Sequence, residues 1–498
     1  MSAGTIIDSQ EAKLRIARLP LQKPFEAEKE LAELLDTVLA NPPEPDDLFD
    51  LLEYTRTSLN FIRAGAIRHF QEKAPNLETE AEKHFQRGLE MWQRMVKAYT
   101  LCAEKMAVCD DNKLHRATVL HRCLYYTAMQ IFDHYRVKRQ LPPGIWKQAN
   151  YFYAQAEEGG LARHAVLREN GSDDIRKTYC QALYASLLLV EFAQPFSRDS
   201  KELNLLLDWA EQTGPLVRIG RPKVAEQKTA FLVDLDSDQA LRPMPGGVIA
   251  PTVRALGTST LIAHLRTMNE RFNKTPEQAH LDNENLARAR RLLAEMIVTW
   301  ALAAMPRRYR RRPASGLVKL CSGFHNMHYY ILGHEFTQPG APAESHAVDH
   351  KFEEWLVVDQ NPCGFRLTRE GVGAPLENHQ LIAICPHDGE DYLLAQIHWL
   401  MQEQSGRLTA GLAALPGIPQ AVSIRTEERV KGQRAFYVRA FMLPAIPAMQ
   451  TDATIILTPG LYHLGAVLEI LGQGNVVLKD LVQRGSDFDR VSFTPAQN

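Results

Sequence analysis

The chain has 498 residues, a formal net charge of −2 and 45% hydrophobic residues. This length predicts about three domains, each large enough for a core of its own. The near-zero net charge disfavours a general nucleic-acid binder, because such proteins carry a surplus of basic residues. No apolar run reaches about 18 residues, so we expect no membrane-spanning helix.

Seven cysteines are scattered along the chain at irregular spacing. The first residues lack the basic segment and the apolar core that together make a secretion signal. An odd number of unpatterned cysteines without such a signal is typical of reduced thiols. We therefore expect a cytoplasmic protein.

Residues 1–215 are expected to form an α-helical domain, a bundle or an array of antiparallel helices. Apolar residues recur there at helical spacing, separated by short breaks such as Leu141-Pro142-Pro143-Gly144. The predicted helices cover residues 24–39, 48–67, 78–106, 113–135, 146–156, 173–192 and 201–212. No phosphate loop or metal motif occurs in this half, so we interpret it as a scaffold that binds a protein partner.

Residues 216–304 are interpreted as a mixed connector with long helices at 258–268 and 283–304. Asp234, Asp236 and Asp238 alternate in the way that opens a calcium loop. The glycine and the closing glutamate that such a loop requires are missing, so we expect an ordinary acidic turn.

A dense run of arginines follows the last of these helices. It comprises Arg307, Arg308, Arg310, Arg311 and Arg312. The planar guanidinium group matches both a phosphate and the O6/N7 edge of guanine, so the run suits a nucleotide ligand. The alternative is a solvated basic linker.

Short apolar runs bounded by turn residues follow the arginines, and they predict a small antiparallel barrel or sandwich. These runs cover residues 315–320, 355–359, 364–367, 381–384, 393–399 and 408–412. Further strands are predicted at 434–444, 454–457, 466–470 and 475–478. We expect residues 421–498 to be a second small β-barrel-like domain with a structural role, and the whole chain to be an α+β multidomain protein.

The order of motifs in residues 305–420 resembles a PilZ domain, the bacterial receptor for cyclic di-GMP. An Arg-x-x-x-Arg pair comes first, then a turn-rich motif that begins at Asp359. Gly364-Phe365-Arg366-Leu367, a strand that ends in Ile397-His398-Trp399, and Gly411-Leu412 complete the order. The resemblance implies a PilZ-like antiparallel β-barrel whose arginines grip guanine and phosphate, while the second motif holds the other face of the ligand.

The resemblance assigns the arginine pair to Arg307 and Arg311. A frame one residue later, Arg308 and Arg312, fits as well, and we prefer the first because Tyr309 then lies inside the motif.

The second motif falls on Asp359, Asn361 and Gly364. Asn361 stands where the family usually has serine, and residues 333–352 lengthen the segment between the two motifs. The Asp359 carboxylate would accept protons from guanine N1 and N2. Gly364 is expected to adopt a positive φ that lets the backbone approach the ligand.

Three histidines, His325, His328 and His334, precede this motif. On a strand, His325 and His328 would point to opposite faces, so we expect no metal site.

The sequence predicts a cyclic di-GMP effector that couples ligand binding to a partner of the helical domain. We expect no enzymatic activity, no cofactor besides the ligand and no binding to DNA. Two alternatives remain: a degenerate PilZ-like scaffold that binds no nucleotide, and an RNA- or single-strand-binding protein that uses the arginine run. Strong salt dependence would mark the latter.

Overall fold

The computed structural model divides the chain into two compact units, which we describe separately. The helical unit extends to residue 305, and the barrel unit comprises residues 306–498 with the short segments 138–140 and 196–199. The structure describes residues 8–72, 78–109, 112–168, 176–222, 231–242, 249–274, 283–301, 309–337, 350–386, 389–426 and 436–496.

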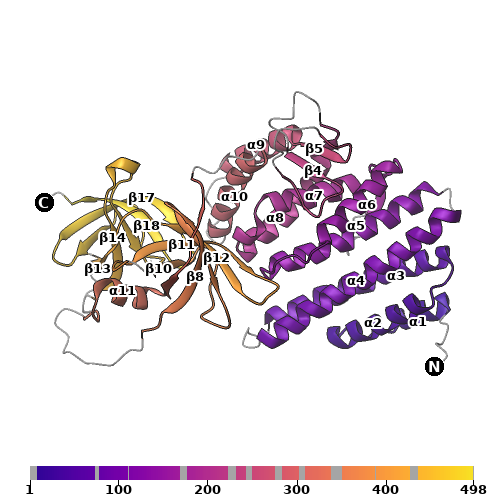
Figure 1. Cartoon of the computed structure of the whole chain (residues 1–498), viewed down its shortest axis with the longest axis horizontal. Helices are drawn as coiled ribbons and strands as arrows, with labels where there is room; N and C mark the ends of the chain where they lie inside the picture. Colours follow the sequence, from indigo (N-terminus) through magenta and orange to yellow (C-terminus); the bar gives the residue numbers. More distant parts are fainter. Residues whose placement is uncertain are drawn as a thin grey trace. The chain divides into compact units, whose positions relative to one another are not determined.

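In the first unit, α3, α4, α5 and α6 pack side by side in chain order, and α1 and α2 both pack against α3 (Figure 1). Their bounds are α1 Ser9–Ala17, α2 Pro24–Ala40, α3 Pro45–Glu72, α4 Glu78–Cys109, α5 Lys113–Arg136, α6 Ile145–Glu158, α7 Cys180–Phe192, α8 Ser200–Thr213, α9 Ser259–Lys274 and α10 Asn283–Ala301. The expectation of a helical N-terminal region is confirmed.

Local sequence explains several helix ends. Asn112 begins α5, because its side-chain oxygen accepts the backbone N–H groups of Leu114 and His115 at 3.1 and 3.4 Å. Pro24 occupies the first turn of α2, where its missing N–H costs no hydrogen bond.

The helix predicted over 173–192 is wrong at its start. The segment Arg176–Thr178 forms β2, which pairs antiparallel with β1 (Val166–Arg168), and α7 begins only at Cys180. Residues 176–178 therefore make strand hydrogen bonds with β1 in place of the helical hydrogen bonds that the apolar spacing predicted.

The core of the helical unit encloses paired charges. Arg122 of α5 is 2% exposed and donates from Nε and Nη2 to the two carboxylate oxygens of Glu53, both at 2.9 Å. Arg63 of α3 contacts Glu28 at 2.8 Å. Buried charges of this kind require such partners, because desolvation of an unpaired ion costs several kcal/mol.

Residues 218–257 add a small sheet to the helical unit, in the order β3 (Arg218–Gly220), β5 (Val253–Gly257) and β4 (Phe231–Asp234). The acidic turn after β4 has a structural role. Asp238 accepts the N–H groups of Gly144 and Lys147 at 2.6 and 3.0 Å and thereby caps α6. Trp300 of α10 is fully buried and donates to the Leu189 carbonyl, so α10 also belongs to this unit.

The barrel unit contains two antiparallel barrels (Figure 1). In the first, the order β7-β10-β11-β12-β9-β8 closes because β8 pairs with both β7 and β9, and the short β6 extends β7 along β8. Its strands are β6 Arg312–Pro313, β7 Leu317–Ser322, β8 Glu353–Asn361, β9 Gly364–Arg369, β10 Leu381–Cys385, β11 Leu393–Gln402 and β12 Leu408–Ala414. The predicted strands are present here, each somewhat longer than its apolar run.

The second barrel closes in the order β13-β14-β15-β18-β17-β16. Its strands are β13 Gln420–Thr426, β14 Val438–Leu443, β15 Thr454–Leu457, β16 Val467–Ile470, β17 Gly474–Arg484 and β18 Asp489–Pro495. Strands β13 and β18 were not predicted, because their mixed polar and apolar residues give only short alternating patterns.

Helix α11 (Phe324–Leu332) packs between the barrels, and Met327 shares a buried cluster with Leu381, Phe441 and Phe488. The strand assumed for His325 and His328 is therefore wrong: both residues lie on a helix. The apolar residues between Phe324 and Leu332 suit either structure in so short a segment.

Among the residues that the structure describes, no helix is long and apolar enough to cross a membrane.

Candidate functional site

The arginine run and the second motif meet at the start of the first barrel. Strand β6 pairs with β8 so that Pro313 lies opposite Asp359. Arg311, directly before β6, places Nη1 2.5 Å from Asp359 Oδ1, and the two side chains are 25% and 19% exposed. Two segments that are distant in sequence thus meet at a partly exposed surface.

A row of side chains continues from this pair across the outer face of the barrel. The strand registers align Asp359 with Arg366, Arg366 with Gly411, and Gly411 with Trp399. Cross-strand partners share a face of the sheet. The neighbouring residue Leu367 is buried in the barrel core, so the row faces outward. We call Asp359, Arg366, Gly411 and Trp399 the outer row.

The outer row ends in a cation–π pair, Arg366 and Trp399. The guanidinium carbon of Arg366 lies 5.9 Å from the centroid of the Trp399 ring. A Cβ atom on Gly411 would lie only 1.9 Å from Trp399 Nε1, so the indole ring needs a glycine beneath it. The row spans four strands, roughly 14 Å at the usual strand spacing.

Asn361, the residue that departs from the PilZ pattern, holds its own turn. Its Oδ1 accepts the backbone N–H of Cys363 at 2.9 Å, which closes the short connection between β8 and β9. Asparagine suits this turn because its side-chain oxygen reaches the backbone N–H two residues further on; its side-chain NH₂ group makes no hydrogen bond with the residues that the structure describes.

The prediction that Gly364 adopts a positive φ is wrong. This residue does not adopt a positive φ; it starts β9 in an ordinary strand conformation. A Cβ atom there would lie 2.0 Å from the carbonyl oxygen of Leu412, so glycine is required by the close approach of β12.

The other predicted arginines are placed differently. Arg307 and Arg308 lie outside the described residues. Arg310 and Arg312 are exposed, and Arg312 lies opposite Gln360 in the β6–β8 ladder. Of the arginine-pair residues that the structure describes, Arg311 rather than Arg312 contacts Asp359.

Glu403 borders the outer row. Hydrogen bonding from the Thr409 hydroxyl lowers the pKa of Glu403 most, and the charges of Arg407 and Arg366 add to this. The Thr409 hydroxyl contacts the carboxylate at 2.7 Å. The Glu403 carboxylate therefore stays ionised, and its negative charge lies close to the positive charges of Arg366 and Arg407.

Arg366 and Trp399 were not among the predicted site residues, although both lie in motifs shared with PilZ domains, Gly364-Phe365-Arg366-Leu367 and Ile397-His398-Trp399. Alternation alone would have placed them outside the barrel, since Leu367 and Leu400 beside them are buried. Their alignment across β12 depends on the bulge between Ile397 and Trp399, which the sequence does not reveal.

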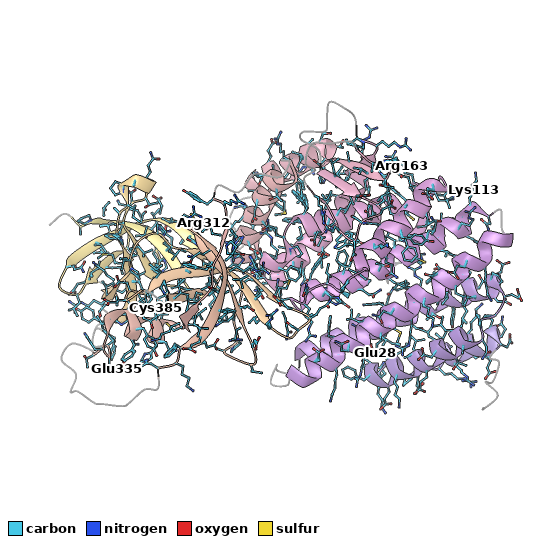
Figure 2. All side chains as sticks on the ribbon, viewed as in Figure 1. Glu28, Lys113, Arg163, Arg312, Glu335 and Cys385 are labelled. Atoms are coloured by element: carbon cyan, nitrogen blue, oxygen red, sulfur yellow. The ribbon has the colours of Figure 1, made fainter. Side chains whose placement is uncertain are left out.

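A second polar cluster lies at α11, where His325, Glu335 and His350 bring two imidazoles and a carboxylate together. Among the described residues, this is the cluster with the donor set of a metal site. Figure 2 shows Glu335 well apart from Arg312 on the barrel unit.

The fold and the outer row define a protein with a helical domain, two barrels and a polar outer face on the first barrel. Two family models match it: "Cyclic-di-GMP receptor FimW, N-terminal domain" over residues 10–223, and "FimW C-terminal beta-barrel domain" over residues 422–496. Together they cover more than half of the chain, which belongs to the FimW family.

A curated relative, "Cyclic-di-GMP receptor FimW" of Pseudomonas aeruginosa, is 21% identical over 478 residues, an alignment that covers 82% of this chain and 77% of the relative. The expectation of a cyclic di-GMP receptor family is confirmed, but the family is FimW rather than PilZ. The two matched ranges lie on either side of residues 305–420, where the PilZ-like motifs occur.

Proposed function

We propose that this chain is a receptor for cyclic di-GMP and that the ligand binds the outer row of the first barrel together with Arg311. The Arg311–Asp359 contact carries the proposal, because it joins the two motifs at an accessible face. The family and the curated relative, whose printed name is that of a cyclic di-GMP receptor, support the ligand class.

The residues suit the chemistry of the ligand, which carries two phosphates and two guanines. The Arg311 guanidinium would grip a phosphate or the O6/N7 edge of a guanine. Asp359 uses Oδ1 for Arg311, which leaves Oδ2 to accept the N1 and N2 protons of guanine. The Arg311 contact would orient the carboxylate for that role.

The Arg366–Trp399 pair would supply a flat surface for the second base. Stacking of a base on an aromatic ring contributes about 1–3 kcal/mol, and an arginine plane stacks in the same way. Gly411 has no Cβ atom, which leaves the space that the Trp399 ring occupies and so sets the position of the indole for this role.

The assignment of Arg307 to the arginine pair follows from Arg311. If Arg311 occupies the second position, the frame preferred from the sequence places Arg307 at the first. Arg308 and Arg312 would then lie beside the ligand as additional positive charges. Asn361 would donate from its amide nitrogen while its oxygen holds the turn.

The chain would act as a receptor rather than an enzyme, with the helical unit as the surface for a protein partner and no bound cofactor. Helix α10 ends at Ala301, a few residues before the arginine run. A ligand that grips the arginines would therefore act close to the end of α10, and this is the route by which ligand binding could reach the helical unit. We place the protein in the cytoplasm, where its cysteines would stay reduced.

The two alternatives make different predictions. A scaffold without nucleotide would bind no ligand at the outer row, and an RNA-binding protein would need more than one aromatic residue on a basic face. Trp399 is the only aromatic member of the outer row. The negative charges of Asp359 and of the neighbouring Glu403 also interrupt the positive charge of this face. The family match does not favour either alternative.

Competition binding tests the proposal. The full chain, with fluorescent cyclic di-GMP as the probe, should lose the probe to unlabelled cyclic di-GMP. GTP, cyclic GMP or a short RNA should not displace it at the same concentration. Displacement by RNA with steep salt dependence would support the RNA-binding alternative, and no binding of the probe would support the scaffold.

A further inference from the structure

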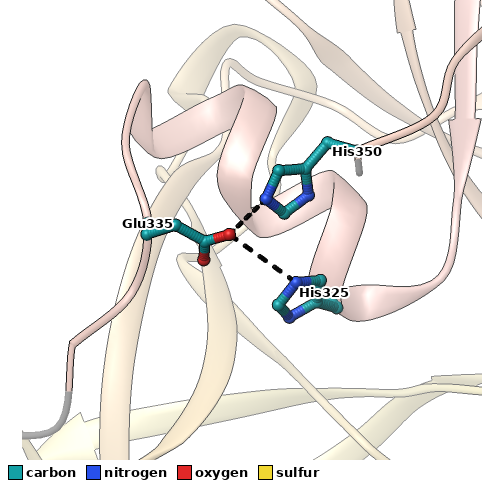
Figure 3. Close-up of side chains that lie close together, drawn as sticks. All are labelled: His325, Glu335 and His350. Atoms are coloured by element: carbon teal, nitrogen blue, oxygen red, sulfur yellow. Dashed lines mark hydrogen bonds and ion pairs between the residues drawn. The ribbon is translucent and has the colours of Figure 1, made fainter. Parts of the chain in front are cut away.

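The cluster at α11 joins residues from three places in the barrel unit (Figure 3). His325 lies in the first turn of α11, Glu335 lies just beyond the helix, and His350 precedes β8. His350 Nε2 contacts Glu335 Oε1 directly, and His325 Nε2 lies 3.9 Å from the same oxygen. The ligand atoms of the three side chains all lie within 4.8 Å of one another.

Packing fixes the more buried imidazole. The His350 side chain is 7% exposed, and its ring stacks on Tyr329 with a centroid distance of 3.7 Å and an interplanar angle of 5°. Tyr330 donates its hydroxyl proton to the His350 carbonyl at 3.0 Å. The ring orientation is therefore set before any ligand arrives, as a metal site requires.

A hydrogen-bonded pair alone does not account for the cluster. The contact between His350 and Glu335 would exist without His325. Yet His325 Nε2 is buried, faces the same carboxylate and has no hydrogen bond among the described residues. A buried ring nitrogen without a partner costs free energy. An ion between the three groups would satisfy it.

We propose that His325, Glu335 and His350 bind a divalent transition-metal ion, with zinc the best match. Two imidazole nitrogens and one carboxylate oxygen form a donor set that zinc uses in open sites with further positions for water or another ligand. Bonds of about 2.0–2.2 Å place ligand atoms roughly 3–4 Å apart, so a small rotation of the side chains closes the site.

The surroundings allow entry and add one opposing charge. The Glu335 side chain is 41% exposed, so a cation can reach its carboxylate from solvent, whereas His325 Nε2 is buried behind it. Arg439 lies over the Phe336 ring at 5.0 Å and raises the local positive potential. The ionised Glu335 offsets this charge, which makes it the most important of the three ligands.

Zinc titration of the full, tag-free chain tests the proposal. The protein is stripped of metal and then competes with a chromophoric chelator for Zn²⁺. Wild type should hold about one more ion than His325→Ala or Glu335→Gln under conditions where the chelator is half saturated. These two residues are chosen because they are partly exposed, so their substitution leaves the core intact; circular dichroism checks this.

His334→Ala is the matched control, since His334 is exposed and lies one residue from Glu335 but outside the cluster. It should retain the ion. Cobalt substitution should give a d–d absorption spectrum in wild type that Glu335→Gln changes. Equal zinc content in wild type, His325→Ala and Glu335→Gln, or no bound zinc in wild type, would overturn the proposal.

Discussion

Arg366 and Trp399 lie on strands that are not neighbours, yet the guanidinium carbon of one lies 5.9 Å from the ring centroid of the other. Gly411 of β12, the strand between them, makes this contact possible because it has no side chain. This cation–π pair extends the polar surface that begins at Arg311 and Asp359 across four strands of the first barrel.

Removing the indole should weaken ligand binding without unfolding the barrel. Trp399→Ala should raise the Kd for cyclic di-GMP about 5–150-fold, because stacking of one base contributes about 1–3 kcal/mol. Trp399→Phe should recover part of the loss. Calorimetric titration measures the Kd of both variants. An unchanged Kd in Trp399→Ala would show that no base stacks on Trp399.

Gly411→Ala tests the same surface indirectly. A Cβ atom at this position would displace the Trp399 ring, since it would lie 1.9 Å from Nε1. We expect weaker binding of similar size, together with a change in tryptophan fluorescence. A variant that binds as wild type does would show that the ring position is immaterial.

Arg311→Ala should weaken binding about 5–150-fold, in line with the 1–3 kcal/mol that a bidentate arginine contributes to guanine recognition. Its effect on stability should stay below about 1 kcal/mol, because the pair with Asp359 is partly exposed. Arg310→Ala is the control, since Arg310 is exposed and lies next to Arg311. Equal losses in the two variants would mean that only general charge matters.

Gly364→Ala should destabilise the first barrel by about 1–3 kcal/mol, because the new methyl group would meet the Leu412 carbonyl at 2.0 Å. Hydrogen exchange in β9 and β12 locates the change. Gly220→Ala is the control, since a Cβ atom there has no neighbour within 4 Å. Unchanged exchange in Gly364→Ala would contradict the packing argument.

The helical unit should lose stability in acid through Glu53. Burial by itself raises the pKa of Glu53, but the hydrogen bond and charge of Arg122, with the charge of Arg56, outweigh it and lower the pKa to about 2. A lowered folded-state pKa stabilises the fold above the ordinary value near 4.5, and this contribution is lost as the pH falls towards 2.

Glu53→Gln isolates that contribution. Urea unfolding, followed by helical circular dichroism, should show a deficit on the order of 3 kcal/mol at pH 7. The deficit should shrink between about pH 4.5 and 2, because wild-type Glu53 becomes protonated there. A deficit that does not change with pH would point to lost packing rather than to lost charge.

Periodicity predicted the regular parts of this fold. The apolar spacing of α4 and the alternation at the start of β8 carry their own signal, since each has one buried face. It failed where tertiary pairing decides the structure, as at β2, and in α11, whose apolar residues fit a helix and a strand equally.

The site was predictable in part for the same reason. The resemblance assigned Arg311 and Asp359 to one ligand site. In the structure the two residues lie close together because β6, which follows Arg311, pairs with β8, which contains Asp359. Trp399 and Gly411 could not be joined to them from sequence, since their alignment depends on strand register and on one bulge. The error at Gly364 arose because a glycine in sequence does not reveal which strand approaches it.

Calorimetric titration of cyclic di-GMP into the full chain tests the central claim most directly. We expect wild type to bind at micromolar concentration or tighter, and Arg311→Ala and Asp359→Ala each to bind much more weakly, with Arg310→Ala close to wild type. No binding by wild type at millimolar ligand would contradict the receptor function. Tight binding that survives both substitutions would instead place the ligand away from the outer row.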